Sequence, residues 1–253
     1  MLFDVTLFSD GSNIQRKPKG HLYLYPLIAI AAMLAIVFVM DLPHMHKPKQ
    51  QLSQTIRIPA GQRAQMDLPD GSIVWLNSQT TLTYDENFGK KDRKVTLDGE
   101  AYFEVAHNKE IPFYVQTENI KVQVTGTKFD VCSYKGSNSF IARLIEGSIN
   151  LLTNNAKEEK PITSLTKGKY FSMENGKYKT GEMSSNNALA WMQGIYYFDD
   201  VPFKELLDKI ALYYNYKITV KNPKILENYR CTGKFKDLDG IEHILKVIQK
   251  DHP

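Results

Sequence analysis

The sequence predicts a mainly β protein, in which an antiparallel, solenoid-like β domain over residues 54–181 precedes a small α+β module over residues 182–253. Three observations predict this fold class. Apolar and polar side chains alternate from residue 55 to about residue 178, turn-forming residues separate the alternating runs, and helical spacing appears only after residue 181. A single transmembrane helix is predicted before the β domain, over residues 22–40.

Short β-strands are predicted throughout the β domain. In one run, Ile120, Val122 and Val124 alternate with Lys121 and Gln123, which places the apolar side chains on one face of a strand. Turn signals that contain glycine recur at residues 69–71, 98–99, 126, 135–136, 146–147, 167–168 and 175–176. Short strands at such even spacing are typical of a sandwich, a barrel or a solenoid-like stack.

The module after residue 181 is predicted to alternate between strands and helices. Its strands are expected at residues 195–198, 217–220 and 229–235. Apolar side chains at helical spacing predict one helix with Pro202 at its first position and a second helix capped by Asp239. A polar segment at residues 184–187 is expected to begin another helix, which leads to Trp191. The order β-α-β, β-α lacks a last strand, so we expect an incomplete module.

Residues 22–40 contain no charged side chain. As a helix this run would span ~28 Å, close to the ~30 Å hydrocarbon core of a bilayer. Arg16, Lys17 and Lys19 precede it, which favours an N-terminus on the cytoplasmic side. The sequence therefore predicts a membrane anchor with the bulk of the chain on the far side.

Two alternatives to an anchor fit the sequence less well. A cleaved signal peptide would end in a small-x-small site, which residues 38–43 lack. A core helix that is apolar all round needs a large protein around it, which residues 1–21 cannot supply. We therefore expect a cytoplasmic segment at residues 1–21 and a polar linker at residues 41–53.

Composition and motifs argue against several classes of function. The net charge of +4 is small and the charges are dispersed, so no nucleic-acid partner is predicted. The chain lacks a Gly-rich phosphate loop, an H-E-x-x-H pair, a nucleophile elbow and a Cys-x-x-Cys pair, so we expect no enzymatic activity and no cofactor. His44 and His46 form an H-x-H pair, but no further ligand lies nearby in sequence to complete a metal site.

Three weaker patterns have two interpretations each. Glu100 and Glu104 share one face of a predicted strand. They form either a glycosidase pair or part of a solvated strand face, and we prefer the second interpretation. Residues 237–240 resemble part of a calcium loop, and a helix N-terminus explains them better. Cys132 and Cys231 either form a disulfide or act as small apolar fillers in strands, which is the preferred interpretation.

Several sequence runs occur together and in one order, at residues 70–78, 82–84, 95–105, 112–115, 122–131 and 144–148. The first run reads Asp-Gly-Ser-Ile-Val-Trp-Leu-Asn-Ser. In these runs the chain resembles the FecR family of membrane-bound sigma-factor regulators. The tail from Trp191 resembles the small C-terminal module of Bacteroidetes members, which is similar to the signalling domain of TonB-dependent transducers and to a secretin N-terminal module.

The resemblance implies a non-enzymatic protein of the bacterial inner membrane, with most of its chain in the periplasm. That part would sense the signalling domain of a TonB-dependent outer-membrane transporter and thereby control an extracytoplasmic-function sigma factor. In the family a cytoplasmic helical domain holds the sigma factor. Residues 1–21 are too short for such a domain, so we do not expect these residues to bind the sigma factor directly.

The residues that match the family motif are interpreted as structural. Asp70 and Gly71 would form a turn, and Trp75 and Phe103 would face the core. The full set is Asp70, Gly71, Trp75, Leu76, Asn77, Gly99, Glu100, Phe103, Val105, Gly126, Thr127, Phe129, Glu146 and Gly147.

The partner site is predicted in the C-terminal module, on an exposed strand edge to which a partner adds a strand. The residues of this edge are Tyr229, Arg230, Thr232, Lys234 and Phe235. Two other functions stay open. A membrane-anchored scaffold or glycan-binding module would contact no sigma factor, and an anchored envelope hydrolase would need a catalytic motif that the sequence lacks.

Overall fold

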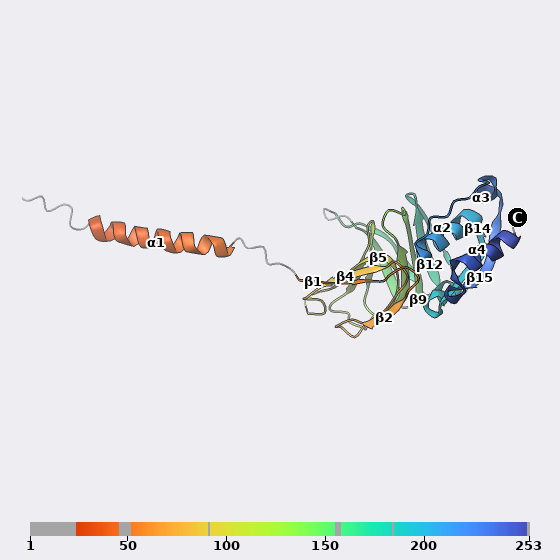
Figure 1. Cartoon of the computed structure of the whole chain (residues 1–253). Coiled ribbons are helices and arrows are strands. Elements are labelled where there is room, and N and C mark those ends of the chain that lie inside the picture. Colours follow the sequence, from red (N-terminus) through yellow and green to blue (C-terminus); the bar gives the residue numbers. More distant parts are fainter. Residues whose placement is uncertain (1–23, 46–51, 91, 155–157, 184, 252–253) are drawn as a thin grey trace, which may run out of the picture. The chain divides into compact units, whose positions relative to one another are not determined.

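The computed structural model describes residues 24–45, 52–90, 92–154, 158–183 and 185–251 (Figure 1). They belong to two compact units, Met1–Gln50 and Gln51–Pro253. The predicted cytoplasmic segment at residues 1–21 lies outside the described residues, as do His46 and the side chain of His44.

The first unit contains helix α1 (Leu24–Met45). Large apolar side chains along it are exposed, including Tyr25 at 70%, Met33 at 69% and Phe38 at 67%. Within the described part of the chain, no helix meets the combined length and hydropathy of a membrane span.

Thirteen strands of the described residues form one curled sheet that folds into two layers around a common core. In spatial order, the first layer contains β1 (Ser53–Arg57), β4 (Thr81–Asp85), the first half of β5 (Arg93–Glu104), β6 (Phe113–Gln116), β7 (Ile120–Val124), β10 (Ser148–Thr153) and β11 (Pro161–Thr166). The second layer contains β2 (Ala64–Asp67), β3 (Ile73–Leu76), the second half of β5, β8 (Lys128–Ser133), β9 (Ser139–Glu146), β12 (Lys169–Glu174) and β13 (Lys177–Glu182). We call these two layers the sandwich.

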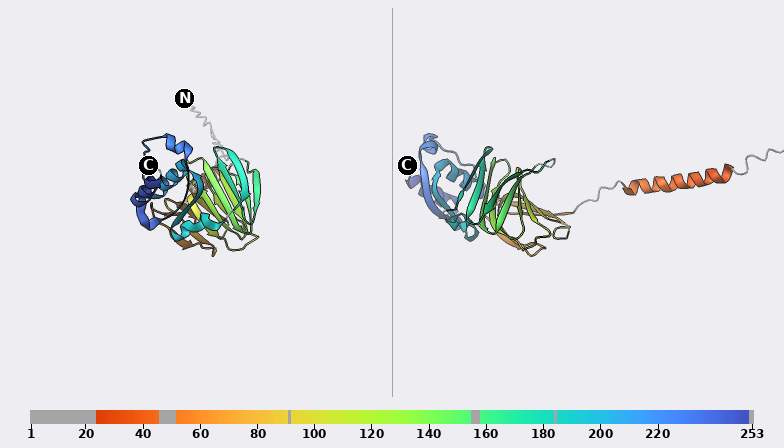
Figure 2. Two further views of the ribbon diagram at one scale, coloured as in Figure 1. Left: turned by 90° about the vertical axis from the view of Figure 1, so that its right-hand side faces the viewer. Right: turned by 180° about the vertical axis from the view of Figure 1, so that it is seen from behind.

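The predicted mainly β, antiparallel domain is confirmed, and its hairpins stack in a regular way. Hairpins β6–β7 and β10–β11 belong to the first layer, and hairpins β8–β9 and β12–β13 belong to the second. The chain therefore alternates between layers with each hairpin, which accounts for the evenly spaced turn signals in the sequence. Figure 2 shows the curled sheet from two further sides.

The core lies between the layers, where the inward-facing side chains of both meet. Phe103 in the second layer contacts Phe113 in the first, with 5.9 Å between ring centroids. Phe103 also stacks on Phe129 at 5.1 Å. All three rings are fully buried. The period-two alternation predicts this face correctly, because successive side chains of a strand point to opposite sides of the sheet.

Strand β5 passes from one layer to the other, and this corner permits a short parallel connection. Residues 93–96 pair in parallel with β6, and residues 105–112 make the connection. A straight strand from Arg93 to Glu104 would run ~36 Å, farther than the ~32 Å that residues 105–112 could return. The strand therefore has to bend, and its pairing changes from β4 to β8 at Gly99, where φ is 135°.

The C-terminal module contains η1 (Asn186–Gln193), β14 (Ile195–Pro202), α2 (Phe203–Tyr214), α3 (Lys224–Asn228), β15 (Arg230–Lys236), η2 (Asp237–Asp239) and α4 (Gly240–Asp251). Strands β14 and β15 form an antiparallel ribbon (Figure 1, blue). An apolar cluster joins the module to the outer face of the second layer, with Tyr102 and Tyr134 from the sandwich and Trp191, Tyr196 and Phe203 from the module. The predicted small α+β module is thus confirmed, in the order β-α-α-β-α.

The strand predicted at residues 217–220 is wrong. Ile218 and Val220 pack against the apolar cluster and alternate with exposed neighbours, as in a strand. However, no strand of the described residues pairs with them. The segment is extended because it lies on a core, without a ladder of hydrogen bonds, and alternation alone cannot distinguish these two cases.

Two helix starts also differ from prediction. Pro202 has an extended backbone, with φ −54° and ψ 139°, and α2 begins one residue later at Phe203. Asp239 belongs to η2, where its carboxylate accepts a hydrogen bond from the backbone N–H of Lys236 at 3.3 Å. It therefore stabilises the turn before α4 instead of capping α4 itself.

Candidate functional site

Three of the four motif glycines lie where the chain passes between the two layers. Gly99 marks the corner of β5, Gly126 joins β7 to β8, and Gly147 joins β9 to β10. A Cβ atom at Gly99 would lie 2.4 Å from Thr80 Oγ1, and one at Gly126 would lie 2.4 Å from His107 Nδ1. No side chain fits at such distances, so close packing requires glycine at these corners.

The remaining motif residues around Gly147 also serve this corner. The Thr127 hydroxyl is buried and donates a hydrogen bond to the Ser148 carbonyl at 3.0 Å. Glu146, directly before the glycine, is exposed. None of these contacts creates a binding site, and their effect is to connect the two layers.

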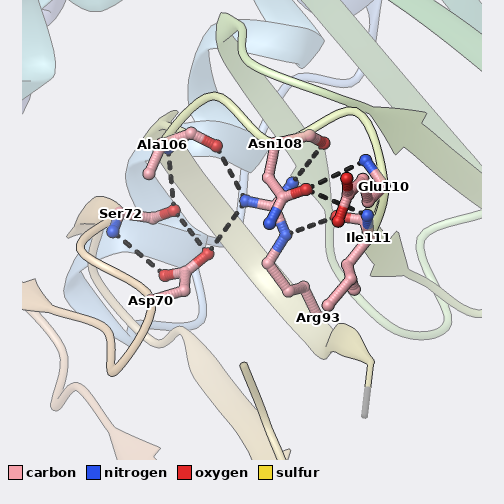
Figure 3. Close-up of polar contacts among 7 residues, drawn as sticks. All are labelled: Asp70, Ser72, Arg93, Ala106, Asn108, Glu110 and Ile111. Atoms are coloured by element: carbon pink, nitrogen blue, oxygen red, sulfur yellow. Dashed lines mark hydrogen bonds and ion pairs between the residues drawn. The ribbon is translucent and has the colours of Figure 1, made fainter. Parts of the chain in front are cut away.

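Asp70 begins the turn before β3 and also forms an ion pair. Gly71 follows it with φ 82° and lies at the surface. The Asp70 carboxylate accepts hydrogen bonds from the Ser72 backbone N–H at 3.0 Å and hydroxyl at 2.8 Å, and it pairs with the Arg93 guanidinium at 3.2 Å (Figure 3). The sequence analysis missed Arg93, because an arginine in a charged run is typical of a solvated surface.

Arg93, whose side chain is 2% exposed, holds the connection between β5 and β6. Its guanidinium donates hydrogen bonds to the carbonyls of Ala106 and Ile111 at 2.7 Å and of Asn108 at 3.1 Å. Figure 3 shows these carbonyls and the Asp70 carboxylate arranged around the guanidinium. The network secures the parallel pairing of β5 with β6, so its role is structural.

Apolar motif residues occupy the core of the sandwich, namely Leu76, Phe103, Val105 and Phe129. Trp75 does not, which corrects the prediction that it faces the core. It is half-buried on the outer face of β3 and packs against the cluster beneath the C-terminal module. In the sequence, an apolar residue on the outer face of a strand cannot be distinguished from a core residue when a second module covers that face.

A polar junction joins the sandwich to the end of helix α2. The Tyr213 carbonyl accepts hydrogen bonds from the Ser78 hydroxyl at 2.5 Å and from the Gly61 backbone N–H at 2.9 Å. The Gln79 side-chain amide donates to the Leu212 carbonyl. These contacts supply partners for carbonyls at the end of α2, where donors within the helix run out.

Glu100 is buried at this polar junction, with 3% of its surface exposed. Its carboxylate accepts hydrogen bonds from Asn77 Nδ2 at 2.6 Å and from the Tyr213 hydroxyl at 3.1 Å, and Arg143 lies 3.9 Å away. The prediction of a solvated strand face is wrong for Glu100, because the module covers it. Glu104 remains partly exposed, so the two carboxylates do not form an open catalytic pair.

Arg143 also pairs with a second buried carboxylate, that of Asp130, with 2.6 Å between Arg143 Nη1 and Asp130 Oδ2. Burial raises the pKa of Asp130 to about 7, against the lowering effect of Arg143, and Glu100 raises it further. Asp130 Oδ1 and the Trp191 indole N–H are both buried and form no hydrogen bond of standard geometry with a described residue, but the Trp191 indole is close enough to lower the pKa of Asp130. The junction therefore places two carboxylates and one guanidinium beneath the module, an arrangement that the sequence analysis missed.

A second polar contact closes the other side of the junction. Arg63 of the sandwich pairs with Asp237 of η2, whose carbonyl accepts a hydrogen bond from the Tyr214 hydroxyl at 3.1 Å. Residues 237–240 thus connect the module to the sandwich. Among the residues that the structure describes, no group of three His, Cys, Asp or Glu side chains lies close enough to hold a metal ion.

The structure contains no disulfide between Cys132 and Cys231. Both side chains are partly buried and pack against the cluster that joins module and sandwich. Burial raises the pKa of the Cys132 thiol well above its ordinary value. These surroundings fit the role of apolar fillers.

Strand β15 is the edge proposed for a partner in the sequence analysis. It pairs with β14 along one edge, and no strand of the described residues pairs with the other. Arg230, Thr232 and Lys234 are exposed, Tyr229 is 46% exposed, and Phe235 is turned toward the module's core. The edge therefore combines an available strand with alternating exposed side chains.

Comparison with known proteins places both parts of the second unit in one family. Residues 54–150 match the model for FecR protein, and residues 195–253 match the model for FecR, C-terminal. No curated protein matches the chain. Two crystal structures of a candidate anti-sigma factor from Parabacteroides distasonis ATCC 8503 are similar, each with a TM-score of 0.67 and 25% identity over 79% of this chain and 92% of that chain. With both family models matched in order along one unit, this chain belongs to the FecR family.

Proposed function

We propose that this protein is a membrane-anchored receiver that regulates an extracytoplasmic-function sigma factor in response to a TonB-dependent outer-membrane transporter. Membership of the FecR family supports a sigma-factor regulatory sensor without enzymatic activity. The similarity to a candidate anti-sigma factor supports the same function. The observation that carries the partner assignment is the exposed edge of β15, in a module held firmly on the sandwich by the polar junction.

The proposed arrangement has a cytoplasmic segment at residues 1–21, a membrane span at residues 22–40 and a linker at residues 41–53. The sandwich and the module, residues 54–253, then lie in the periplasm. The uncharged run in the sequence and the exposed apolar side chains along α1 support the anchor. A helix whose apolar side chains face outward is stable in lipid, where its backbone groups are already paired.

Membrane fractionation tests the anchor. The full chain should stay with membranes after an alkaline carbonate wash, and a reporter enzyme fused after residue 253 should be active only in the periplasm. Release of the full chain by the wash would contradict the proposal. A variant with Ala31→Arg and Ile36→Arg serves as control, because charges at the centre of a span are costly.

Strand addition along β15 would let the main chain of a transporter signalling domain pair with the strand, while exposed side chains select the partner. Thr232 and Lys234 point outward and are suitable positions for a photo-crosslinking residue. Crosslinks to the signalling domain are expected from positions 232 and 234. The matched control is position 180, which is exposed on the edge strand β13. Crosslinks from position 180 alone, or from none of these positions, would contradict the assignment of β15.

Transcript measurements test the regulatory function as a whole. Deletion of the gene should change the transcript levels of a sigma-factor regulon that includes a TonB-dependent transporter, and the full chain supplied in trans should restore them. A form with Thr232→Glu and Lys234→Glu, at two exposed positions of β15 that leave Cys231 and Phe235 in place, should be stable yet fail to respond to the transporter's substrate. An unchanged transcript profile after deletion would overturn the proposed function.

A further inference from the structure

A hollow lies between the two layers of the sandwich, and none of its lining residues belongs to β15 or to the polar junction. Its volume is about 500 Å³, within the range of small-molecule sites in proteins. It is lined by Asn119, Ile120, Asn138, Thr153, Ile162, Met173, Asn175, Gly176 and Tyr178. We call it the mouth of the sandwich.

The mouth is formed by turns that gather at one end of the stacked hairpins. Asn119 belongs to the β6–β7 turn of the first layer, whereas Asn138 and Asn175 belong to the β8–β9 and β12–β13 turns of the second. The backbone N–H of Asn175 donates to the Asn138 carbonyl at 3.1 Å, so these two turns are held side by side. Mouths of β-barrels and similar curled sheets are preferred places for ligands.

The lining is uncharged, and this decides the class of ligand. None of the lining residues carries a charge, so an anionic or cationic ligand would find no opposite charge there. The side-chain amides of Asn119, Asn138 and Asn175 have no hydrogen-bond partner among the described residues, and each amide offers both donors and an acceptor. These groups match the alternating donors and acceptors of sugar hydroxyls.

The mouth also has an apolar side, formed by Ile162, Met173 and Tyr178. The Tyr178 ring is 59% exposed and rests on Phe171, with 5.6 Å between centroids. A supported aromatic ring with an exposed face suits the C–H face of a pyranose, since aromatic side chains combine a flat apolar surface with a polar tip. We propose that the mouth of the sandwich binds a neutral carbohydrate, with Tyr178 as the stacking platform and the three asparagines as hydrogen-bond partners.

The test measures binding to the full chain in lipid nanodiscs, since a maltoside detergent would compete. Saturation-transfer NMR and calorimetry would use the neutral trisaccharides maltotriose, cellotriose, xylotriose and mannotriose, with trigalacturonate as the charged counterpart. At least one neutral trisaccharide should bind, and trigalacturonate should bind more weakly. Absence of binding by all four neutral sugars, or tighter binding of trigalacturonate, would overturn the proposal.

Variants assign the binding to the mouth. Tyr178→Ala should weaken it about tenfold, as expected for the loss of one aromatic contact. Tyr178→Phe should retain it. Asn138→Gly and Asn175→Gly together remove two amides but keep the positive φ angles of 53° and 49° at these turns, and they should also weaken binding.

The matched control for Tyr178 is Tyr216→Ala, since Tyr216 is also 59% exposed but lies in the C-terminal module. Binding should be unchanged in this variant. Equal loss in Tyr178→Ala and Tyr216→Ala, or no loss in Tyr178→Ala with its circular dichroism unchanged, would place the carbohydrate elsewhere and refute the assignment. Neither result depends on sigma-factor control, so the two proposals fail separately.

Discussion

Arg93 and Arg143 are both arginines of the sandwich that are removed from water, but their partners differ in kind. Arg93 is surrounded by three backbone carbonyls and one carboxylate, at the connection between β5 and β6. Arg143 faces two carboxylates, Asp130 and Glu100, at the polar junction beneath the module. The first network has one carboxylate among three carbonyls that cannot titrate, whereas the second holds two carboxylates around one guanidinium, so we expect the second network to respond more strongly to pH.

This difference also separates the two regions by role. The Arg93 network lies within the sandwich, where Asp70 of the β2–β3 turn meets the connection between β5 and β6, and we expect the parallel pairing of these two strands to depend on it. The Arg143 network lies between two parts of the fold, and the strength of module attachment depends on it. The module carries the proposed partner edge, so a titratable junction would influence the receiver without unfolding the sandwich.

The largest effect is expected for Arg93→Met. The change leaves Asp70 buried without its counter-charge and three carbonyls without a donor, and breaking such a buried pair costs about 3–5 kcal/mol. The loss, measured by hydrogen exchange of β5 and β6, should change less between pH 6 and pH 8 than the loss caused by Arg143→Met. Arg143→Met is the comparison, since its loss should be smaller at pH 6, where a proton can replace the guanidinium. Equal pH dependence of the two variants would contradict the distinction drawn between them.

Gly99→Ala is expected to cost about 3 kcal/mol, through overpacking together with a backbone angle that alanine rarely adopts. The new Cβ would lie 2.6 Å from Thr80 Cα, a backbone atom that cannot turn away. The matched control is Gly71→Ala, which also has positive φ but meets no atom within 4 Å and should cost about 1 kcal/mol. Tryptophan fluorescence during urea unfolding measures both. A Gly99→Ala cost no greater than that of Gly71→Ala would show that the corner can relax.

Asp130→Asn should remove a pH dependence from the junction. The folded pKa of Asp130, about 7, lies above its ordinary value of 3.8, so the folded state holds an extra proton between these values. Stability should therefore fall by a few kcal/mol as the pH rises from about 4 to about 7, and level off above. In the Asn variant this slope should be absent.

The measurement is the difference in unfolding free energy between wild type and Asp130→Asn at several pH values. Taking the difference cancels the titration of exposed carboxylates that both proteins share. Asp85→Asn, at a partly exposed position on β4, is the control and should leave the wild-type slope unchanged. A slope that survives in Asp130→Asn would assign the proton to another group, and Glu100 would be the next to test.

The sequence predicted the parts of the fold that depend on local patterns. Alternation predicted strands such as β7, and helical spacing predicted α2. Glycine positions predicted the corners, because a glycine signals close approach or positive φ wherever it lies. Each of these signals is contained in a few neighbouring residues.

The polar junction could not be predicted in this way. Asp130, Arg143 and Glu100 occupy alternate strand positions that look solvated, and only the module, joined much later in the chain, buries them. The same contact turns Trp75 from a presumed core residue into a junction residue. Arg93 is hidden for a related reason, since its acceptors are backbone carbonyls and carry no signal in the sequence.

The smallest effect is expected for Tyr213→Phe, which removes the hydroxyl that donates to Glu100 at 3.1 Å. Glu100 keeps its contact with Asn77, so the cost should be about 1 kcal/mol. Because Tyr213 belongs to α2, the loss should appear as faster hydrogen exchange in the module while the exchange of β6 and β7 stays unchanged. Tyr197→Phe, at an exposed position of β14, is the control and should change neither. If Tyr213→Phe accelerated exchange equally in the module and in the sandwich, the two regions would open together, and the junction would be part of one cooperative core rather than an attachment that can be tuned separately.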